Sequence, residues 1–263
     1  MADSLVIIPT YNEKENIAAI IKAVFSLNVP LHQFFHVLII DDGSPDGTAH
    51  IVEQLMEKHP FALHLIKRNG KQGLGSAYLH GFAWALESGY NYICEMDADF
   101  SHNPADLLRL RAACENKAPV AVGSRYIKGG KCKNWSLDRK ILSYGASLYV
   151  RLITGMRVKD PTAGFVCYNR AVLEMLDLEK IKFKGYAFQI EMKYAVISMG
   201  YEIVEVPITF KDRIIGHSKM SKNIIQEAIF GVFNMHWSKF TPDHYNKKNK
   251  VKLRIDYTTA MGE

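Results

Sequence analysis

Short apolar runs alternate with amphipathic stretches along the first half of the chain. Mostly apolar runs of strand length occupy residues 5–9, 37–40, 63–66, 92–96 and 120–122. Between them, apolar residues recur at helical spacing over residues 13–27, 46–59, 74–88 and 106–116. Strands that alternate with helices in this way are typical of βαβ units and of a parallel sheet with helices on both faces. We therefore predict an α/β fold with a mostly parallel central sheet flanked by helices.

The alternation breaks in the second half of the chain. Residues 124–138 contain two glycines and three lysines, which predicts a basic loop. Helices are predicted over residues 139–154 and 185–199, and a strand over residues 202–206. A further amphipathic helix is predicted over residues 223–240, and a basic tail follows it. The sequence shows no internal repeat and no clean domain boundary.

The composition is that of an ordinary globular protein. Of 263 residues, 48% are hydrophobic and 23% are charged, which excludes collagen-like, low-complexity and disordered classes. No apolar stretch approaches the ~18 residues of a membrane-spanning helix, and the N-terminus lacks the features of a signal peptide. We therefore expect a cytoplasmic protein. Its four cysteines match no metal-binding spacing, so we expect reduced thiols that fill the core or the surface.

The segment Asp97-Ala98-Asp99 directly follows the predicted strand over residues 92–96. In extended backbone, residues i and i+2 point to the same side, so the two carboxylates face one way. Carboxylate oxygens suit Mg²⁺ or Mn²⁺ that is bound through substrate phosphates. An Asp pair that caps a turn is the alternative, but the apolar strand before the pair and the predicted helix after it favour a metal–nucleotide site.

Two further polar segments follow the first two predicted strands. Residues 9–13 offer Tyr11 to cover a base and Glu13 to hydrogen-bond one, although helix capping is an alternative for this segment. Residues 41–47 offer Asp42 to a base edge or a ribose hydroxyl, and their other polar side chains are expected to form a turn. Because ligands of open α/β sheets bind at the carboxyl ends of strands, we expect these segments in one site.

Eight motifs occur in order along the chain: IIPTYNE, LIIDDGSPDGT, KQGLGSA, MDADFSHNP, GSRY, DPTAGF, GYAFQIEM and FKDRIIGHSK. Together they resemble family-2 glycosyltransferases of the GT-A fold, and more narrowly the dolichyl/polyprenyl-phosphate mannose synthases. Such enzymes move mannose from GDP-mannose to a polyprenyl phosphate. The resemblance implies a GT-A catalytic domain over residues 1–222, with an interfacial helix and basic tail over residues 223–263.

The resemblance also implies roles for the residues that match these motifs. Those expected to line the nucleoside pocket are Pro9, Tyr11, Glu13, Ile40 and Asp42. Those expected to meet the diphosphate and its Mg²⁺ or Mn²⁺ are Asp97, Ala98 and Asp99, with Ser101 as a third metal ligand. The positive residues expected to hold phosphates of the nucleotide sugar are Arg125, Arg213 and Lys219. The residues expected at the acceptor phosphate are Arg125, Arg139 and Ser143. The set expected to act in catalysis is Asp97, Asp99, Arg125 and Arg213.

Physical chemistry agrees with this division of roles. The departing nucleoside diphosphate gathers negative charge, which a cation on the acidic pair and the positive residues would stabilise. A phosphate monoester acceptor has a second pKa of about 6, so it is largely ionised at neutral pH. It needs orientation and charge compensation more than deprotonation. We therefore predict inverting transfer without an essential catalytic base.

A polyprenyl acceptor places the reaction at a membrane. The net charge of +6 and the basic tail suit an anionic leaflet, and the predicted helix over residues 223–240 suits its interface, unless that helix packs in the core. We expect peripheral attachment to the cytosolic face, with a membrane partner subunit possible and no nucleic-acid partner. Three alternatives stay open: a donor such as UDP-glucose, a non-catalytic anion-binding module, or transfer to a hydroxyl with an unidentified base.

Overall fold

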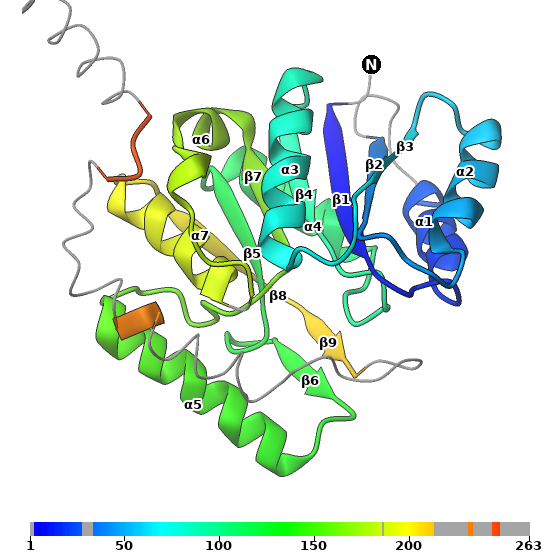
Figure 1. Cartoon of the computed structure of the whole chain (residues 1–263). Helices are drawn as coiled ribbons and strands as arrows, with labels where there is room; N and C mark the ends of the chain where they lie inside the picture. The colour runs from blue at the N-terminus through cyan, green and yellow to red at the C-terminus, as the bar shows by residue number, and fades with distance from the viewer. Residues whose placement is uncertain (1–2, 28–33, 186, 213–230, 234–243, 248–263) are drawn as a thin grey trace, which may run out of the picture.

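The computed structural model describes residues 3–27, 34–185, 187–212, 231–233 and 244–247. Its centre is a seven-stranded sheet in the order β3-β2-β1-β4-β7-β5-β8 (Figure 1). The strands are β1 (Ser4–Thr10), β2 (Phe35–Asp41), β3 (Leu63–Lys67), β4 (Tyr92–Glu95), β5 (Val120–Ser124), β7 (Val166–Asn169) and β8 (Ile203–Pro207). β7 runs antiparallel to both of its neighbours, and the other pairings in this sheet are parallel. The prediction of an α/β fold with a mostly parallel sheet is confirmed.

Helices cover both faces of this sheet (Figure 1). The first face is covered by α3 (Leu74–Glu87), α6 (Arg170–Met175) and α7 (Ala187–Ser198), and the second by α1 (Ile17–Phe25), α2 (Thr48–Lys58) and α4 (Asp106–Asn116). Along β1, Leu5 and Ile7 pack into the first core, whereas Val6 and Ile8 pack into the second. Successive side chains of a strand point to opposite faces, so a continuous apolar run forms a strand buried on both sides. The four cysteines are free thiols, as predicted.

One helix and a second small sheet lie beyond the main sheet, at the bottom of Figure 1. The helix is α5 (Leu137–Thr154), and the sheet pairs β6 (Lys131–Lys133) with β9 (Thr209–Lys211) in parallel. The predicted loop over residues 124–138 is therefore wrong in part. β6 pairs with a strand far along the chain, which local composition does not indicate. α5 begins at Leu137 because the side chain of Ser136 accepts a hydrogen bond from the backbone N–H of Arg139.

Residues 166–180 contain short elements for which the sequence gives no periodic signal. β7 follows the turn at residues 160–165 directly, and α6 begins where β7 ends. The side chain of Asn169 caps α6 by accepting a hydrogen bond from the backbone N–H of Ala171 at 2.9 Å. A 3₁₀ turn, η2 (Leu178–Lys180), comes next. Elements of three to six residues are too short to show a helical or strand period, so they escape pattern analysis.

Two short parts of the C-terminal region are described. Val232 is buried against Val150 of α5, and Tyr245 is fully buried, with its carbonyl accepting the backbone N–H of Asp177 at 2.7 Å. The helix predicted over residues 223–240 lies mostly outside the described residues, so its interfacial role stays a prediction. Within the described segments, no helix combines the length and the apolarity needed to cross a membrane.

Candidate active site

The polar segments predicted from the sequence meet at one edge of the sheet. β1, β2, β4 and β5 share one direction, and the loops that follow them begin at Tyr11, Asp42, Met96 and Arg125. All four loops therefore lie at the carboxyl ends of their strands. This is the edge at which open α/β sheets bind their ligands.

The loops after β1 and β2 are joined to each other by hydrogen bonds. The backbone N–H groups of Asn12 and Glu13 donate to the hydroxyls of Ser44 and Thr48, each at 3.0 Å. The carboxylate of Asp46 accepts from the backbone and the hydroxyl of Thr48. Burial alone would raise the pKa of Asp46, but these hydrogen bonds outweigh it and lower the pKa. The polar residues of the second loop thus form a turn, as predicted, and hold the first loop beside it.

Asp42 forms a buried ion pair that sequence reasoning missed. The Nε of Arg68 donates to the Asp42 carboxylate at 2.5 Å, and the backbone N–H of Gln72 donates to its second oxygen at 3.2 Å. Arg68 is also fixed by the hydroxyl of Ser76 at 2.8 Å. A nucleoside would therefore meet a carboxylate–guanidinium pair rather than an isolated carboxylate. The sequence places Lys67 and Arg68 directly before the glycine-rich residues 69–75, but it gives no sign that Arg68 pairs with Asp42.

The remaining residues predicted for the nucleoside pocket lie at the ends of β1 and β2 and in the loop that follows β1. Pro9 and Ile40 lie directly opposite each other in neighbouring strands, Pro9 partly exposed and Ile40 buried. The ring of Tyr11 lies 5.3 Å from the ammonium group of Lys71, a distance suited to a cation–π contact. The residues predicted for a nucleoside therefore lie at one edge of the sheet, with Lys71 beside Tyr11, and their role in binding stays a prediction.

The acidic segment after β4 is folded back on itself. The backbone N–H of Asp97 donates to Nδ1 of His102 at 3.3 Å, and that of Ser101 donates to the Asp99 carboxylate at 3.0 Å. The His102 ring stacks on Phe165 with 4.7 Å between ring centres. About a third of the Asp97 side chain (33%) is exposed, whereas Asp99 is buried. The Asp97 carboxylate is thus the more accessible of the two, and the Asp99 carboxylate also holds the backbone of the loop.

The donor set around this segment fits a divalent cation. Ser101 is buried, and its hydroxyl oxygen has no hydrogen-bond partner. A buried oxygen without a hydrogen-bond partner, two residues beyond Asp99, is the kind of group that a hard cation satisfies. Among the described residues, no three His, Cys, Asp or Glu side chains form a metal cluster. Two carboxylates and a hydroxyl instead suit an ion that takes its other ligands from a diphosphate.

Arg125 is held in place by the turn at residues 160–165. Its Nε and Nη2 donate to the Asp160 carboxylate at 2.8 and 2.6 Å, and Nη2 also donates to the Thr162 hydroxyl. Burial disfavours the charged guanidinium, but the carboxylate outweighs this effect and raises the pKa of Arg125. Three of its five N–H groups are thus used inside the protein, so any phosphate would meet mainly Nη1.

Arg139 and Ser143 extend from α5 toward Arg125. Nη1 of Arg139 donates to both oxygens of Asp212 at 2.8 Å, and its guanidinium lies 4.3 Å from the ring of Trp135. The guanidinium of Arg125 lies 5.6 Å from the same ring. Ser143 accepts a hydrogen bond from the hydroxyl of Tyr126 at 2.6 Å. The three residues predicted for the acceptor phosphate therefore share one cluster. Trp135 and Asp212 were missed, and Arg213 and Lys219 lie outside the described residues.

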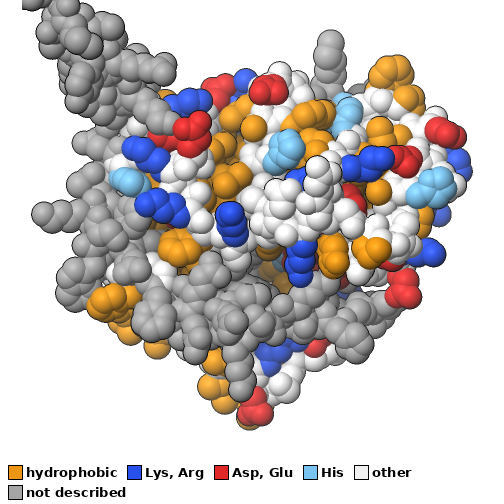
Figure 2. Space-filling model, in the orientation of Figure 1, with side chains coloured by type: hydrophobic (Ala, Val, Ile, Leu, Met, Phe, Trp, Pro, Cys, Tyr) orange, Lys and Arg blue, Asp and Glu red, His pale blue; other side chains and the backbone are white. Residues whose placement is uncertain are grey.

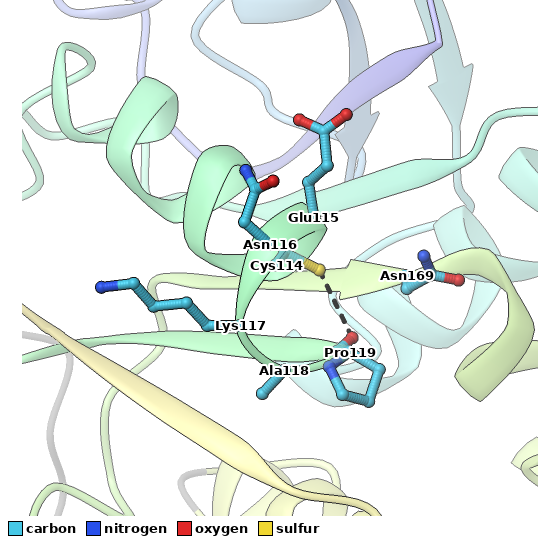
Figure 3. A pocket seen from close by; sticks show the side chains of 7 residues that line it. All are labelled: Cys114, Glu115, Asn116, Lys117, Ala118, Pro119 and Asn169. Atoms are coloured by element: carbon cyan, nitrogen blue, oxygen red, sulfur yellow. Dashed lines mark hydrogen bonds between the residues drawn. The ribbon is translucent and has the colours of Figure 1, made fainter.

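A surface pocket of about 320 Å³ lies at the opposite edge of the sheet (Figure 3). Residues 114–119 and Asn169 line it, and the thiol of Cys114 donates to the carbonyl of Pro119 at 3.3 Å. Its charged side chains, Glu115 and Lys117, point away from each other in Figure 3. The pocket holds none of the predicted residues and no convergent polar groups, so we assign it no function.

Comparisons with known proteins show which proteins the chain resembles. The family model described as Glycosyl transferase family 2 matches residues 5–181. The polyprenol monophosphomannose synthase of Mycolicibacterium smegmatis is 46% identical over 87% of this chain and 85% of its own length.

Two solved structures share the fold. One is glucosyl-3-phosphoglycerate synthase from Mycobacterium tuberculosis in complex with Mn²⁺, UDP and glucosyl-3-phosphoglycerate, with a TM-score of 0.63 and 16% identity over 90% of this chain and 80% of that chain. The other is the mannosyltransferase PcManGT from Pyrobaculum calidifontis in complex with GDP-Man and Mn²⁺, with a TM-score of 0.53 and 16% identity over 90% of this chain and 70% of that chain. At this level of identity, both likenesses concern the fold alone.

Proposed function

The chain belongs to glycosyl transferase family 2, and from this premise we propose that it transfers mannose from GDP-mannose to a polyprenyl phosphate. The observation that carries the proposal is the pairing of two sites at one sheet edge. An acidic segment with an orphaned hydroxyl lies on one side, and a cluster of Arg125, Arg139 and Ser143 lies on the other. The name of the 46% identical relative, a polyprenol monophosphomannose synthase, supports this choice of donor sugar and acceptor.

On the donor side, the residues of the chain bind and orient the nucleotide sugar. Tyr11 and the pair of Asp42 with Arg68 offer a ring face and fixed polar groups to a nucleoside. Asp97, Asp99 and Ser101 would hold Mg²⁺ or Mn²⁺, which supplies charge stabilisation for the diphosphate when it is bound. Both structural neighbours contain Mn²⁺, which supports a divalent ion.

On the acceptor side, the chain orients a phosphate that is already an anion. Arg139 and Nη1 of Arg125 offer N–H groups to its oxygens, and bidentate contact with a guanidinium fixes its direction of approach. The nucleophilic oxygen carries no proton that must be removed at neutral pH. The site therefore performs inverting transfer by positioning and charge compensation, without a general base.

The donor nucleotide is the finer part of this proposal. One neighbour of the fold holds UDP and the other holds GDP-Man, so the fold accommodates either base. Isothermal titration in the presence of Mn²⁺ compares GDP-mannose with UDP-glucose directly. We expect selective binding of GDP-mannose, and selective binding of UDP-glucose would overturn the choice of donor.

The function itself is tested by lipid extraction. The protein is incubated with radiolabelled GDP-mannose, Mn²⁺ and vesicles that contain polyprenyl phosphate, and the mixture is then extracted with organic solvent. We expect label in the organic phase, and none when the polyprenyl phosphate is omitted. Label that stays in the aqueous phase with active protein and both substrates would rule out this transfer. Analysis of the product formed with a short-chain polyprenyl phosphate then identifies the bond that has formed.

α5 supplies the surface by which the site reaches a lipid. Five large apolar side chains recur along one face at intervals of three or four residues and are exposed: Leu137, Ile141, Tyr144, Leu148 and Leu152. Val150 of the same helix is buried against the body of the protein, and Arg139 and Ser143 join the acceptor cluster. The exposed face therefore points away from the side that carries the acceptor residues. This amphipathic arrangement is typical of helices that lie in a membrane interface.

Charge around α5 selects the kind of membrane. Lys128, Lys131, Lys133 and Lys140 are exposed near its N-terminal end. Lysines near an anionic leaflet contribute about 1 kcal/mol each, in addition to the apolar face. We therefore propose peripheral binding at the cytosolic face of an anionic membrane. A membrane partner subunit could also bind the apolar face of α5. Vesicle binding by the isolated protein would show that no such subunit is needed for membrane attachment.

The membrane role of α5 is tested by flotation with anionic vesicles. Burying a large apolar side chain contributes about 1.5–3 kcal/mol, so Ile141→Glu with Leu148→Glu is expected to weaken vesicle binding at least tenfold. Phe61→Glu is the matched control, because Phe61 lies outside α5 and has the largest exposed fraction (84%) of the large apolar side chains among the described residues. Equal binding by the control and the double variant would contradict a membrane role for α5.

A further inference from the structure

Three fully buried polar side chains lie behind the site and have no part in the mechanism above. Glu95 is the last residue of β4, two residues before Asp97, and Gln189 and Lys193 lie one turn apart on α7. All three are at least 97% buried, with exposed fractions of 0% for Glu95, 3% for Gln189 and 0% for Lys193. Burying such groups is costly unless their hydrogen bonds are made, so their presence here needs a reason.

The amide of Gln189 connects the other two. Its Nε2 donates to Oε2 of Glu95 at 2.7 Å, and its Oε1 accepts from Nζ of Lys193 at 3.2 Å. The amide is thus oriented with its donor toward the carboxyl group and its acceptor toward the ammonium group. This arrangement fixes a distance between β4 and α7 that an apolar contact would leave adjustable.

Lys193 carries the connection on to the acceptor side. Its ammonium group also donates to the carbonyl of Ala163 at 2.6 Å and to the carbonyl of Gln189 at 3.1 Å, so its three N–H groups are used. Ala163 lies in the turn at residues 160–165, and the same turn presents Asp160 to Arg125. The path therefore runs from the strand that bears the acidic segment to the arginine of the acceptor cluster.

We propose that Gln189 and Lys193 are positioning residues, which hold the acidic segment after β4 and the acceptor-side turn at residues 160–165 in a fixed relation through this buried path. The inference rests on the proposed function, because it assigns the two ends to donor and acceptor. Transfer between two bound substrates depends on their relative placement, and an error of about 1 Å can cost a hundredfold in rate. Neither side chain contacts a substrate in this account.

A structural readout tests the path without any substrate. Trp135 lies beside both Arg125 and Arg139, so its fluorescence reports on the acceptor cluster. The protein has three tryptophans, and replacing the other two, Trp84 and Trp237, by Phe leaves Trp135 as the only indole emitter. In this background, Lys193→Met and Gln189→Leu are each expected to shift the emission maximum of Trp135 to longer wavelength.

The matched control is Arg111→Met. Arg111 is also a buried cation, which donates to Ser4, Asp3 and Glu115 near the amino end of β1, at the sheet edge opposite the site. Its loss is expected to destabilise the fold in chemical denaturation without a shift of the Trp135 emission of the folded protein. An unchanged Trp135 spectrum in folded Lys193→Met and Gln189→Leu would overturn the proposal.

Kinetics of mannose transfer give the second readout. At equal folded fraction, we expect kcat to fall tenfold or more in both path variants and to stay within twofold of wild type in Arg111→Met. Equal kcat values in all three variants would reduce the path to a structural role. If the wild-type protein forms no mannolipid, the proposed function fails, whereas the fluorescence result still decides whether the path exists.

Discussion

The donor half of the site is held by a buried ion pair, whereas the acceptor half combines a buried pair, Arg125 with Asp160, with a more exposed one. In the donor half, the side chains of Asp42 and Arg68 are only 9% and 5% exposed. In the acceptor half, those of Arg139 and Asp212 are 37% and 34% exposed. Breaking a buried pair by removing one partner costs about 3–5 kcal/mol, whereas an exposed pair contributes about 0–1 kcal/mol.

This difference indicates how each half meets its ligand. The donor half is preformed, because its guanidinium is committed to a carboxylate and to Ser76 before any nucleotide arrives. In the acceptor half, Arg139 can exchange Asp212 for a phosphate at little cost. The two halves also differ in their surroundings, since Arg139 and Ser143 of the acceptor half lie on α5, whose other side exposes apolar side chains. A lipid phosphate would thus find an available arginine on the same helix that carries the exposed apolar face.

The largest expected effect comes from the acidic segment between the two halves. Asp99→Ala removes a buried carboxylate that accepts the backbone N–H of Ser101 and that we expect to hold the metal. We expect transfer to fall about a thousandfold, the size of effect that follows the loss of a group that stabilises transition-state charge. The measurement is mannolipid formation at saturating substrates, with circular dichroism to check the fold.

Asp106→Asn is the control for this variant. Asp106 lies at the start of α4 and pairs with the largely exposed Arg109, so its loss is expected to leave transfer nearly unchanged. Near wild-type turnover of Asp99→Ala with Mn²⁺ present would show that the acidic segment does not serve the reaction as proposed.

The two halves also differ in how far the sequence predicts them. The donor half is made of loops that follow strands directly. The polar residues at the ends of the apolar runs therefore predict that Tyr11, Asp42 and Asp97 lie at one edge of the sheet. The acceptor half depends on contacts between distant segments, such as β6 with β9 and Arg139 with Asp212. No local pattern predicts these pairings. Arg125 and Arg139 were found through the resemblance to a known family, and Trp135 was not found at all.

The second prediction concerns the stability of the donor half. Arg68→Met leaves the buried carboxylate of Asp42 without its cation, so the free energy of unfolding is expected to fall by about 3–5 kcal/mol. Denaturation with urea measures this change. Asp42→Asn combined with Arg68→Met removes the unpaired charge as well, and it is expected to recover part of the loss. A loss below about 1 kcal/mol in Arg68→Met would show that the donor half is not preformed by this pair.

The third prediction concerns the acceptor half, where we expect a change in substrate binding and almost none in stability. Arg139→Met breaks a half-exposed pair, so the free energy of unfolding is expected to change by less than about 1 kcal/mol. The KM for polyprenyl phosphate is expected to rise about tenfold to a hundredfold, since a charge-assisted contact contributes about 1.5–3 kcal/mol. The KM for GDP-mannose is expected to stay the same. A rise in the KM for the donor alone would assign Arg139 to the other half.

The smallest expected effect is a loss of stability in acid that originates in the donor half of the sheet. At the amino ends of β2 and β3, His36 and His64 both contact the hydroxyl of Tyr90, at 2.7 and 3.4 Å. Burial lowers the pKa of both histidines below their ordinary value of 6.5.

The unfolded chain therefore binds protons more readily than the folded protein. The stability that the two neutral histidines contribute is fully present above pH 6.5 and is lost as the pH falls through that value toward the lowered pKa. We expect the urea midpoint to fall between pH 7.5 and pH 5.5, and His64→Gln to reduce that fall, whereas the exposed His50→Gln does not. An identical pH dependence in the three proteins would remove this edge of the sheet as the acid-sensitive region.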